Sequence, residues 1–223
     1  MPDSANDTSA ATETRQILAD CRALLSDDHF VYISGDHGSG WVDKDVIFVD
    51  LERVRRLTQL LANAVRDLDA DILCGPATGG LIVAQWMAFE LGKPAIFAEH
   101  TAPRSRSELR GEFALHRGYD RLVAGKRVLV VDDVVNTGLS VRQTAAAVAS
   151  AGGEVVAIAA LVHRGNVDAA SLGVADYRYL LEYDIPDWPA TECPLCQTDV
   201  PINTRYAHGQ DYLNLQQLRA ADA

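Results

Sequence analysis

The sequence predicts an α/β protein built around a mostly parallel β-sheet with helices on both faces. The first observation is that continuous apolar runs recur, as at Val128–Val131 and within residues 154–163. Such runs are typical of strands that are buried on both faces of a sheet. The second is that these runs alternate with segments whose apolar residues recur every three or four positions, as in amphipathic helices. Regular alternation of this kind favours parallel strands joined by covering helices.

The beginning of the chain is expected to be less regular than the rest. Apolar residues at helical spacing predict a helix over residues 14–25, with Thr12 or Thr14 as its cap. The stretch "HFVYISG" predicts a strand over 29–35, followed by a turn-rich segment with a second short strand. A helix is then predicted over 51–68. Further strands are predicted over 71–75, 94–99, 126–133 and 154–163, and further helices over 80–91 and 138–151.

Composition and charge exclude several classes of protein. A chain of 223 residues fits one domain, which we place at 12–223 after a mobile tail over 1–11. The net charge of -11 argues against a nucleic-acid partner, because binding to a phosphate backbone is driven by clustered Lys and Arg. No apolar run approaches the roughly 18 residues of a membrane span, and the N-terminus lacks a secretion signal. Four cysteines in a chain of this length favour a reducing, cytoplasmic location.

The stretch "VLVVDDVVNTGLS" places two carboxylates and a small polar loop at the end of a predicted strand. Ligands of parallel sheets bind at the carboxyl ends of the strands. The helix predicted after Gly138 would point unpaired N–H groups at the same place, which favours a phosphate. Asp132 and Asp133 would repel a phosphate, but as pure acceptors they suit the hydroxyls of an attached ribose. An ordinary strand-turn-helix junction remains the alternative.

A second loop, "CGPATGG" over 74–80, also lies between a predicted strand and a predicted helix. Its small residues allow consecutive amides to converge on an anion, and Thr78 adds a hydroxyl. A tight turn that needs glycine for steric reasons is the alternative. Two such loops at one edge of a sheet suit a ligand with a phosphate at one end and a pyrophosphate at the other.

These motifs resemble those of type I phosphoribosyltransferases. "VLVVDDVVNTG" is similar to the family's motif for 5-phosphoribosyl 1-pyrophosphate (PRPP), while "CGPATGG" and "SGDHGSGWVDKD" resemble the orotate phosphoribosyltransferase branch. The resemblance implies the family's fold, a mainly parallel sheet flanked by helices with a small hood from residues 29–49 and part of the C-terminal region. It also implies transfer of ribose 5-phosphate to a nitrogenous base with release of pyrophosphate, Mg²⁺ as cofactor and a homodimer. A non-catalytic, PRPP-binding regulator on the same fold is the alternative.

The resemblance also implies roles for individual residues. Asp132, Asp133 and His100 are expected at the reacting centre, and Asn136, Thr137, Gly138, Leu139 and Ser140 at the 5-phosphate. Pro76, Ala77, Thr78, Gly79 and Arg104 are expected at the pyrophosphate, and Ser34, Gly35, Lys44 and Arg164 at the base. Arg104 belongs to the polar stretch 99–113, which in the family is a mobile lid.

The sequence departs from the orotate branch at two cations. Where similar enzymes carry lysine, this chain has Ile33 in the hood strand and His100 before the lid. A neutral imidazole does not replace an ammonium group beside pyrophosphate unless its pKa is raised. Because the carboxylate of orotate needs a cation or several donors when it is buried, we expect orotate to be a poor substrate.

Cys193 and Cys196 in "CPLC" have the spacing of half a zinc site. His208, Cys21 or a partner subunit could supply the remaining ligands. A redox pair and two plain thiols are the alternatives.

Overall fold

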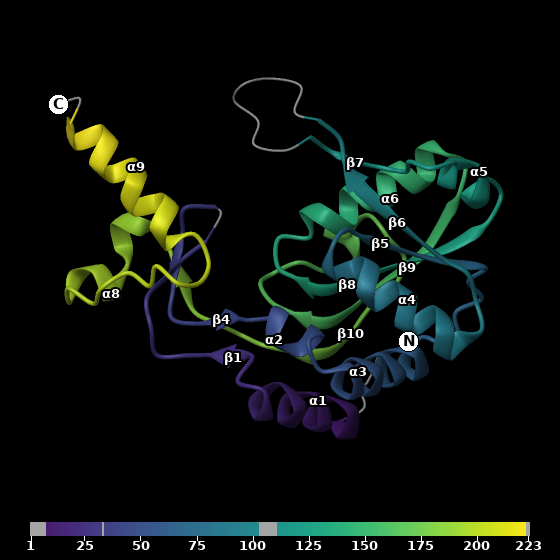
Figure 1. Cartoon of the computed structure of the whole chain (residues 1–223), viewed down its shortest axis with the longest axis horizontal. Coiled ribbons are helices and arrows are strands. Elements are labelled where there is room, and N and C mark those ends of the chain that lie inside the picture. The colour runs from purple at the N-terminus through teal and green to yellow at the C-terminus, as the bar shows by residue number, and fades with distance from the viewer. Residues whose placement is uncertain (1–7, 33, 103–110, 222–223) are drawn as a thin grey trace. The chain divides into compact units, whose positions relative to one another are not determined.

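The computed structural model describes residues 8–32, 34–102 and 111–221, and divides the chain into two compact units (Figure 1). The first unit comprises Met1–Ile17 and Phe48–Tyr183, and the second comprises Leu18–Ile47 and Asp184–Ala223. Within the described ranges, no helix is long and apolar enough to cross a membrane.

A six-stranded sheet forms the centre of the first unit. The strands are β5 (Ile72–Pro76), β6 (Ala95–His100), β7 (Phe113–Ala114), β8 (Arg127–Val135), β9 (Glu154–His163) and β10 (Tyr177–Glu182). Their order across the sheet is β10-β9-β8-β5-β6-β7. Every pairing is parallel except that of β6 with the short β7. The predicted fold class, with a mainly parallel sheet, is therefore confirmed.

Helices cover both faces of this sheet because neighbouring strand residues point to opposite sides. The helices of the first unit are α1 (Thr8–Asp20), α3 (Leu51–Ala64), α4 (Gly79–Leu91), α5 (Tyr119–Val123), α6 (Leu139–Ser150) and α7 (Ala169–Leu172), and α2 (Asp45–Phe48) crosses the boundary between the units. Ile72, Cys74 and Val128 share one apolar core with Val123 of α5 and Val148 of α6. Helices α3 and α4 contact each other and lie against the sheet (Figure 1).

The predicted elements of the first unit differ from the structure mainly at their ends. β9 has the predicted bounds, and α3 ends at Ala64, four residues before the prediction. Its start is set by Asp50, whose carboxylate accepts hydrogen bonds from the amides of Glu52 and Arg53. β8 continues to Val135, so the two acidic residues lie within the strand instead of at its end. β10 was not predicted, because "YRYLLE" has neither a continuous apolar run nor a strict alternation of polar and apolar residues.

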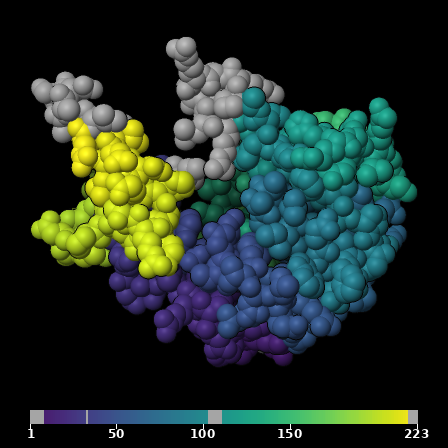
Figure 2. Space-filling model, in the orientation of Figure 1, coloured from purple at the N-terminus to yellow at the C-terminus, as the bar shows by residue number. Residues whose placement is uncertain are grey.

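The second unit contains two small antiparallel sheets. β1 (Leu24–Leu25) pairs with β4 (Trp41–Val42), and β3 (His37–Gly38) lies between β2 (Phe30–Val31) and β11 (Asp187–Trp188). A 3-10 helix, η1 (Ala190–Glu192), and the helices α8 (Pro194–Gln197) and α9 (Gly209–Ala221) follow. The space-filling view shows the yellow C-terminal residues packed against the purple and dark blue residues of this unit (Figure 2). Two distant segments of the chain therefore build one unit.

Two predictions in the N-terminal region were wrong in their bounds. The helix predicted over 14–25 begins at Thr8 and ends at Asp20, and Leu24 and Leu25 form β1. Thr14 is therefore a buried residue inside α1 and does not cap it. The strand predicted over 29–35 is reduced to Phe30–Val31, since the chain turns at Gly35, whose φ of 89° favours glycine.

Candidate active site

Two loops from distant parts of the sequence meet at the carboxyl ends of β5 and β8, which are neighbours in the sheet. A Cβ atom at Gly79 would collide with the carboxylate of Asp133, and one at Gly80 would lie 2.9 Å from Asp132 Oδ1. Only glycine leaves space for this approach, since real Cβ atoms almost never come so close to other atoms. The structure thus brings the glycine loop 76–79 into contact with the acidic pair.

The acidic pair is held in place by its own backbone. Asp132 and Asp133 are 7% and 3% exposed. The amide of Asp133 donates to Asp132 Oδ1 (2.9 Å), and the amide of Val134 donates to Asp133 Oδ1 (2.6 Å). These bonds to backbone amides fix the orientation of each carboxylate, and carboxylate oxygens can accept hydrogen bonds from ribose hydroxyls.

The loop 136–140 leads directly into α6. Gly138 has a φ of 71°, and a Cβ atom there would collide with Leu172, so both backbone conformation and space require glycine. Leu139 N donates weakly to Thr137 Oγ1 at 3.4 Å. Gly138, the residue before α6, makes no side-chain cap to the helix, which leaves amides of the first turn to bind an anion. The helix start therefore suits the phosphate that the sequence predicted here.

His100 ends β6, the strand beside β5. Its Nδ1 donates to the carbonyl of Gly111 (2.7 Å), and its ring lies 3.9 Å from the ring of Phe113, centroid to centroid. Nδ1 is thus occupied by the backbone, and Nε2 is the atom left for a ligand. Arg104, with the other two arginines of the predicted lid, lies outside the described residues.

Arg164 follows β9 and lies beside the 5-phosphate loop. Its amide donates to the carbonyl of Val135 (2.8 Å), and its side chain is buried. A Cβ atom at the next residue, Gly165, would lie 2.9 Å from Asn136 Oδ1. The start of this connection therefore packs against the loop that the sequence predicted to hold phosphate.

The remaining predicted base residues belong to the second unit. Ser34 Oγ donates to Asp36 Oδ2 (2.9 Å), and the amide of Gly35 donates to the carbonyl of Tyr32 (2.9 Å). These contacts form a local turn between β2 and β3. Lys44 follows β4 in the same unit. The structure therefore groups Ser34, Gly35 and Lys44 in one unit and the phosphate loops in the other.

Tyr177 and His163 are polar residues that the sequence did not indicate as part of this edge. The Tyr177 hydroxyl lies 3.0 Å from His163 Nδ1. Burial raises the pKa of Tyr177, and the charge of the nearby Asp132 raises it further. Tyr177 therefore stays protonated near Asp132. It went unnoticed because β10, the strand that carries it, was not predicted.

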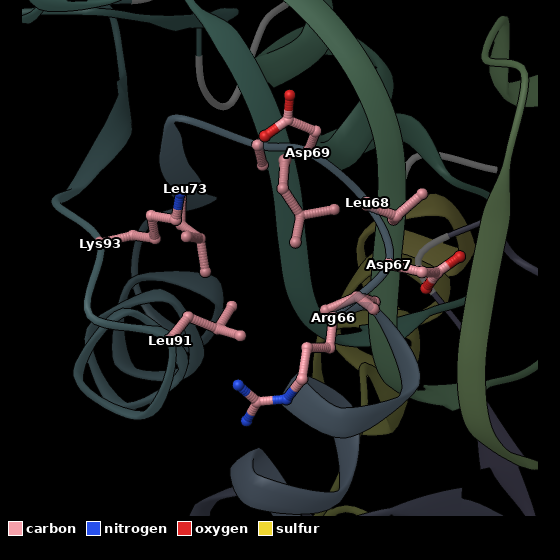
Figure 3. Close-up of a pocket in the computed structure, with 10 residues that line it drawn as sticks. Arg66, Asp67, Leu68, Asp69, Leu73, Leu91 and Lys93 are labelled. Atoms are coloured by element: carbon pink, nitrogen blue, oxygen red, sulfur yellow. The ribbon is translucent and has the colours of Figure 1, made fainter.

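A pocket lies near the amino ends of the strands, on the opposite side of the sheet from the two phosphate loops (Figure 3). It is lined by residues 65–70 before β5, by Lys93 before β6, and by Leu73, Leu91 and Leu129. In Figure 3 the carboxylate of Asp67 points away from Arg66, and it accepts a hydrogen bond from Arg178 Nη2 (2.9 Å). Because the pocket adjoins the amino ends of the strands, it is not part of the candidate active site.

This architecture is typical of α/β proteins that bind a phosphorylated sugar. Its features are a parallel sheet with two glycine-containing loops and an acidic pair at the carboxyl ends of neighbouring strands. The chain belongs to the phosphoribosyl transferase family, because the family model described as "Phosphoribosyl transferase domain" matches residues 48–191. This confirms the resemblance that the three sequence motifs indicate. The matched range contains both phosphate loops, the acidic pair, His100 and Arg164.

Several proteins of the same family are similar to this chain in sequence or in structure. The chain is 41% identical to an orotate phosphoribosyltransferase of Sphingopyxis alaskensis over 184 residues, which cover 80% of this chain and 89% of the relative. The crystal structure of orotate phosphoribosyltransferase from Aeropyrum pernix is 27% identical with a TM-score of 0.57, covering 76% of this chain and 93% of that one. The Mycobacterium tuberculosis enzyme in complex with PRPP is 25% identical with a TM-score of 0.54, covering 78% and 96%.

Proposed function

We propose that this chain transfers the 5-phosphoribosyl group of PRPP to a ring nitrogen of a base, and that orotate is the first base to test. The observation that carries the proposal is the contact between the Gly79 backbone and the Asp133 carboxylate. This contact supports the proposal, because the loop proposed to bind pyrophosphate and the acids proposed to bind ribose lie close enough for one PRPP molecule to reach both. The named orotate phosphoribosyltransferase relatives support the choice of orotate.

Each segment of the site has a distinct part in the proposed reaction. The amides of the loop 136–140 and the first turn of α6 bind the 5-phosphate, and the loop 76–79 with Arg104 binds pyrophosphate. The bond between the anomeric carbon and pyrophosphate breaks with its electron pair leaving on pyrophosphate oxygen. A base nitrogen then forms the new bond to this carbon and loses its proton. Asp132 and Asp133 favour the positive charge that develops on the ribose.

The residues of this edge fit the proposed cofactor, Mg²⁺. This ion prefers oxygen ligands, usually one or two carboxylates together with substrate phosphates and water. Asp132 and Asp133 supply carboxylates next to the pyrophosphate loop. In the proposal, substrate oxygens are the main ligands and the two acids lie close by. The bound ion would neutralise charge on the leaving pyrophosphate.

Recognition of the base rests on residues that we assign by resemblance. Arg164 is proposed to face the base from the end of β9, and Ser34, Gly35 and Lys44 from the second unit. This unit includes most of the predicted hood segment 29–49 and the C-terminal residues from Asp184, and we propose that it acts as the hood. Ile33 lies outside the described residues. Three further statements stay predictions. They are that the chain turns over orotate poorly, that it forms a homodimer and that it is cytoplasmic.

A PRPP-binding regulator without catalysis is the second candidate, and one observation favours it. His100 stands where similar enzymes carry lysine, and its Nδ1 already donates to Gly111. An imidazole offers positive charge to the leaving group only when it is protonated, whereas a lysine ammonium group is charged at neutral pH. The two candidates predict the same binding of PRPP but opposite results when a base is added.

A paired binding and turnover experiment tests the proposal. Calorimetry with PRPP and Mg²⁺ should show binding, and pyrophosphate release should be measured with orotate, uracil, hypoxanthine and adenine. Release with one of these bases supports the enzyme. Binding without release for all four supports the regulator. Absence of any heat at millimolar PRPP would show that both candidates are wrong.

A further inference from the structure

Four side chains of the second unit converge in a cluster that the proposed reaction does not use. His29, His37, Cys193 and Cys196 each direct one ligand atom toward the others, and all four atoms lie within 4.8 Å of one another. His29 lies directly before β2 and His37 opens β3, and these strands pair in antiparallel register. Cys193 and Cys196 flank the first turn of α8. The cluster therefore joins two distant segments of the unit.

The separations between the ligand atoms match a tetrahedral metal site. Zn–N bonds of about 2.0 Å and Zn–S bonds of about 2.3 Å give edges of roughly 3.3 Å between nitrogens and about 3.6 Å between nitrogen and sulfur. His29 Nε2 lies 3.6 Å from Cys193 Sγ and 3.7 Å from Cys196 Sγ. His37 Nδ1 lies 3.3 Å from Cys196 Sγ and 2.8 Å from His29 Nε2. Of these four separations, the one between the two nitrogens is the furthest below its tetrahedral edge, so the two rings would move apart to admit the ion.

The surroundings of the two rings favour ligation by the nitrogens that face the cluster. His29 Nδ1 donates to the carbonyl of Val200 (2.8 Å), which leaves a lone pair on Nε2. Ligand histidines usually have such an outer partner, because it fixes the tautomer and the orientation of the ring. His37 Nε2 has no hydrogen-bond partner among the described residues, and its ring is held edge-on against Tyr212.

Burial of the cluster suits a structural site with one opening. His29, His37 and Cys193 are at most 1% exposed, whereas Cys196 is exposed. Cys196 therefore marks the path by which a metal ion would enter. Two imidazoles and two thiols in so small a volume are polar groups that a cation would satisfy together, and two thiolates would balance the charge of a divalent ion.

We propose that His29 Nε2, His37 Nδ1, Cys193 Sγ and Cys196 Sγ bind one structural Zn²⁺ ion. A donor set of two nitrogens and two sulfurs in tetrahedral geometry is typical of zinc. A [2Fe–2S] cluster with this donor set places histidines and cysteines on different irons, which the close N–S separations do not allow. All four protein positions are filled, so the ion would have no open position for catalysis.

The proposal changes the ligand set that the sequence suggested. The cysteine pair is retained, but the other two candidates have different contacts. His208 Nδ1 lies 3.6 Å from Asp211 Oδ2, and Cys21 Sγ donates to the carbonyl of Leu18 (3.4 Å). A disulfide between Cys193 and Cys196 would use neither histidine and would give no reason for their convergence.

The ion would stabilise a unit that has little core of its own. The second unit has roughly 70 residues, and bodies of this size commonly need a metal or disulfides in addition to packing. Its three-stranded sheet contains only two residues in each strand. A zinc ion would cross-link the hairpin at 29–38 to the C-terminal segment.

Metal analysis of the full chain, purified under reducing conditions, tests the site. We expect about one zinc ion per chain by mass spectrometry, with Cys196→Ser lowering this to less than roughly one fifth. Cys21→Ser is the matched control and should keep the full zinc content. A wild-type chain without zinc that also binds none from micromolar zinc, or full zinc content in Cys196→Ser, would overturn the proposal.

Cobalt substitution supplies a second measurement that does not depend on folding of a variant. The wild-type chain reconstituted with Co²⁺ should show the intense visible bands of a tetrahedral ion and thiolate-to-metal charge-transfer absorption. Weak bands of an octahedral ion, or a Cys193–Cys196 disulfide found by mass spectrometry in the protein as isolated, would contradict the assigned ligands.

Discussion

The candidate active site of the first unit and the four-residue cluster of the second unit are assembled in different ways. The active site is made largely of backbone, with glycines at 79, 80 and 138 that let amides and carboxylates approach closely. The cluster is made of four side chains from two distant segments. The residues of a backbone site are contiguous in the sequence and form recognisable motifs. The residues of a side-chain site are far apart in the sequence, and the tertiary structure brings them together.

The largest expected effect is that of Gly79→Ala, because it tests the backbone site at its tightest contact. The added Cβ would collide with the Asp133 carboxylate. We expect kcat/KM to fall by roughly 100-fold or more, since misplacement of reacting groups by an ångström has effects of this size. Steady-state kinetics measures the change, and zinc content should stay at the wild-type level.

The control for this variant is Gly173→Ala. Gly173 has a φ of 74°, and a Cβ atom there would meet nothing within 4 Å. The substitution introduces backbone strain without a collision, so it should lower stability by about 1 kcal/mol and leave kcat/KM near the wild-type value. Equal losses of activity in both variants would show that glycine matters here for folding and not for the site.

Asp133→Asn tests the charge of the acidic pair with little change of shape. We expect a loss in kcat of about 100-fold, because the neutral amide no longer favours positive charge on the ribose. The thermal midpoint should change little, since Asn keeps the volume and can still accept from the Val134 amide. Asp120→Asn, at an exposed position in α5, is the control. Unchanged turnover in Asp133→Asn would remove this carboxylate from the mechanism.

His100→Lys is expected to have a smaller and opposite effect. An ammonium group at the end of β6 would supply a permanent positive charge beside the proposed position of the leaving pyrophosphate. We expect kcat with the best base to rise by up to about tenfold. Because Lys cannot keep the ring contact with Phe113, thermal melts should accompany the kinetics. A fall in kcat with unchanged stability would indicate that the histidine itself serves the reaction.

Asp67→Asn should have the smallest effect and lies outside both sites. Hydrogen bonds from Arg178 hold the pKa of Asp67 below its usual range. A lowered pKa stabilises the fold above the unfolded-state value of about 3.9, and this contribution is lost as the pH falls through the folded-state pKa. The variant should therefore lose about 0.5 kcal/mol at pH 7 and progressively less below pH 4. A difference in stability between the wild type and the variant that grows as the pH falls would contradict the predicted pH dependence.

The contrast between contiguous backbone motifs and dispersed side chains also explains which features the sequence could predict. The fold class followed from β8 and β9, since strands buried on both faces have continuous apolar sequences. The phosphate loops were indicated because their residues are contiguous. β10 was missed since it has no continuous apolar run, and only residues 180 and 181 of this strand are buried. In the second unit, a strand over 29–35 and a second short strand were predicted, but strands of two residues are too short for a pattern to fix their bounds.

Two of the four proposed zinc ligands could not be predicted for a related reason. Cys193 and Cys196 form a recognisable pair with fixed spacing, but His29 and His37 are separated from them by most of the chain. Neither histidine has a characteristic ligand spacing to the cysteines, which is equally true of His208 and His163. The β2–β3 hairpin, in which His37 pairs with Val31, brings the two histidines together, and the tertiary structure of the second unit adds the two cysteines. A signal would have been the pair of histidines on both sides of a glycine-containing turn.

The position of the acidic pair inside β8 has a consequence for motion. Asp132 pairs with Ala160 and Val134 with Val162, so the ladder between β8 and β9 continues past both acids. The backbone that carries the acids moves far only when that ladder opens, which for core strands approaches the free energy of global unfolding. Adjustments during a catalytic cycle must therefore come from the loops around this strand. The strand that carries the acids therefore stays fixed while the surrounding loops open and close on the microsecond to millisecond timescale of loop motions.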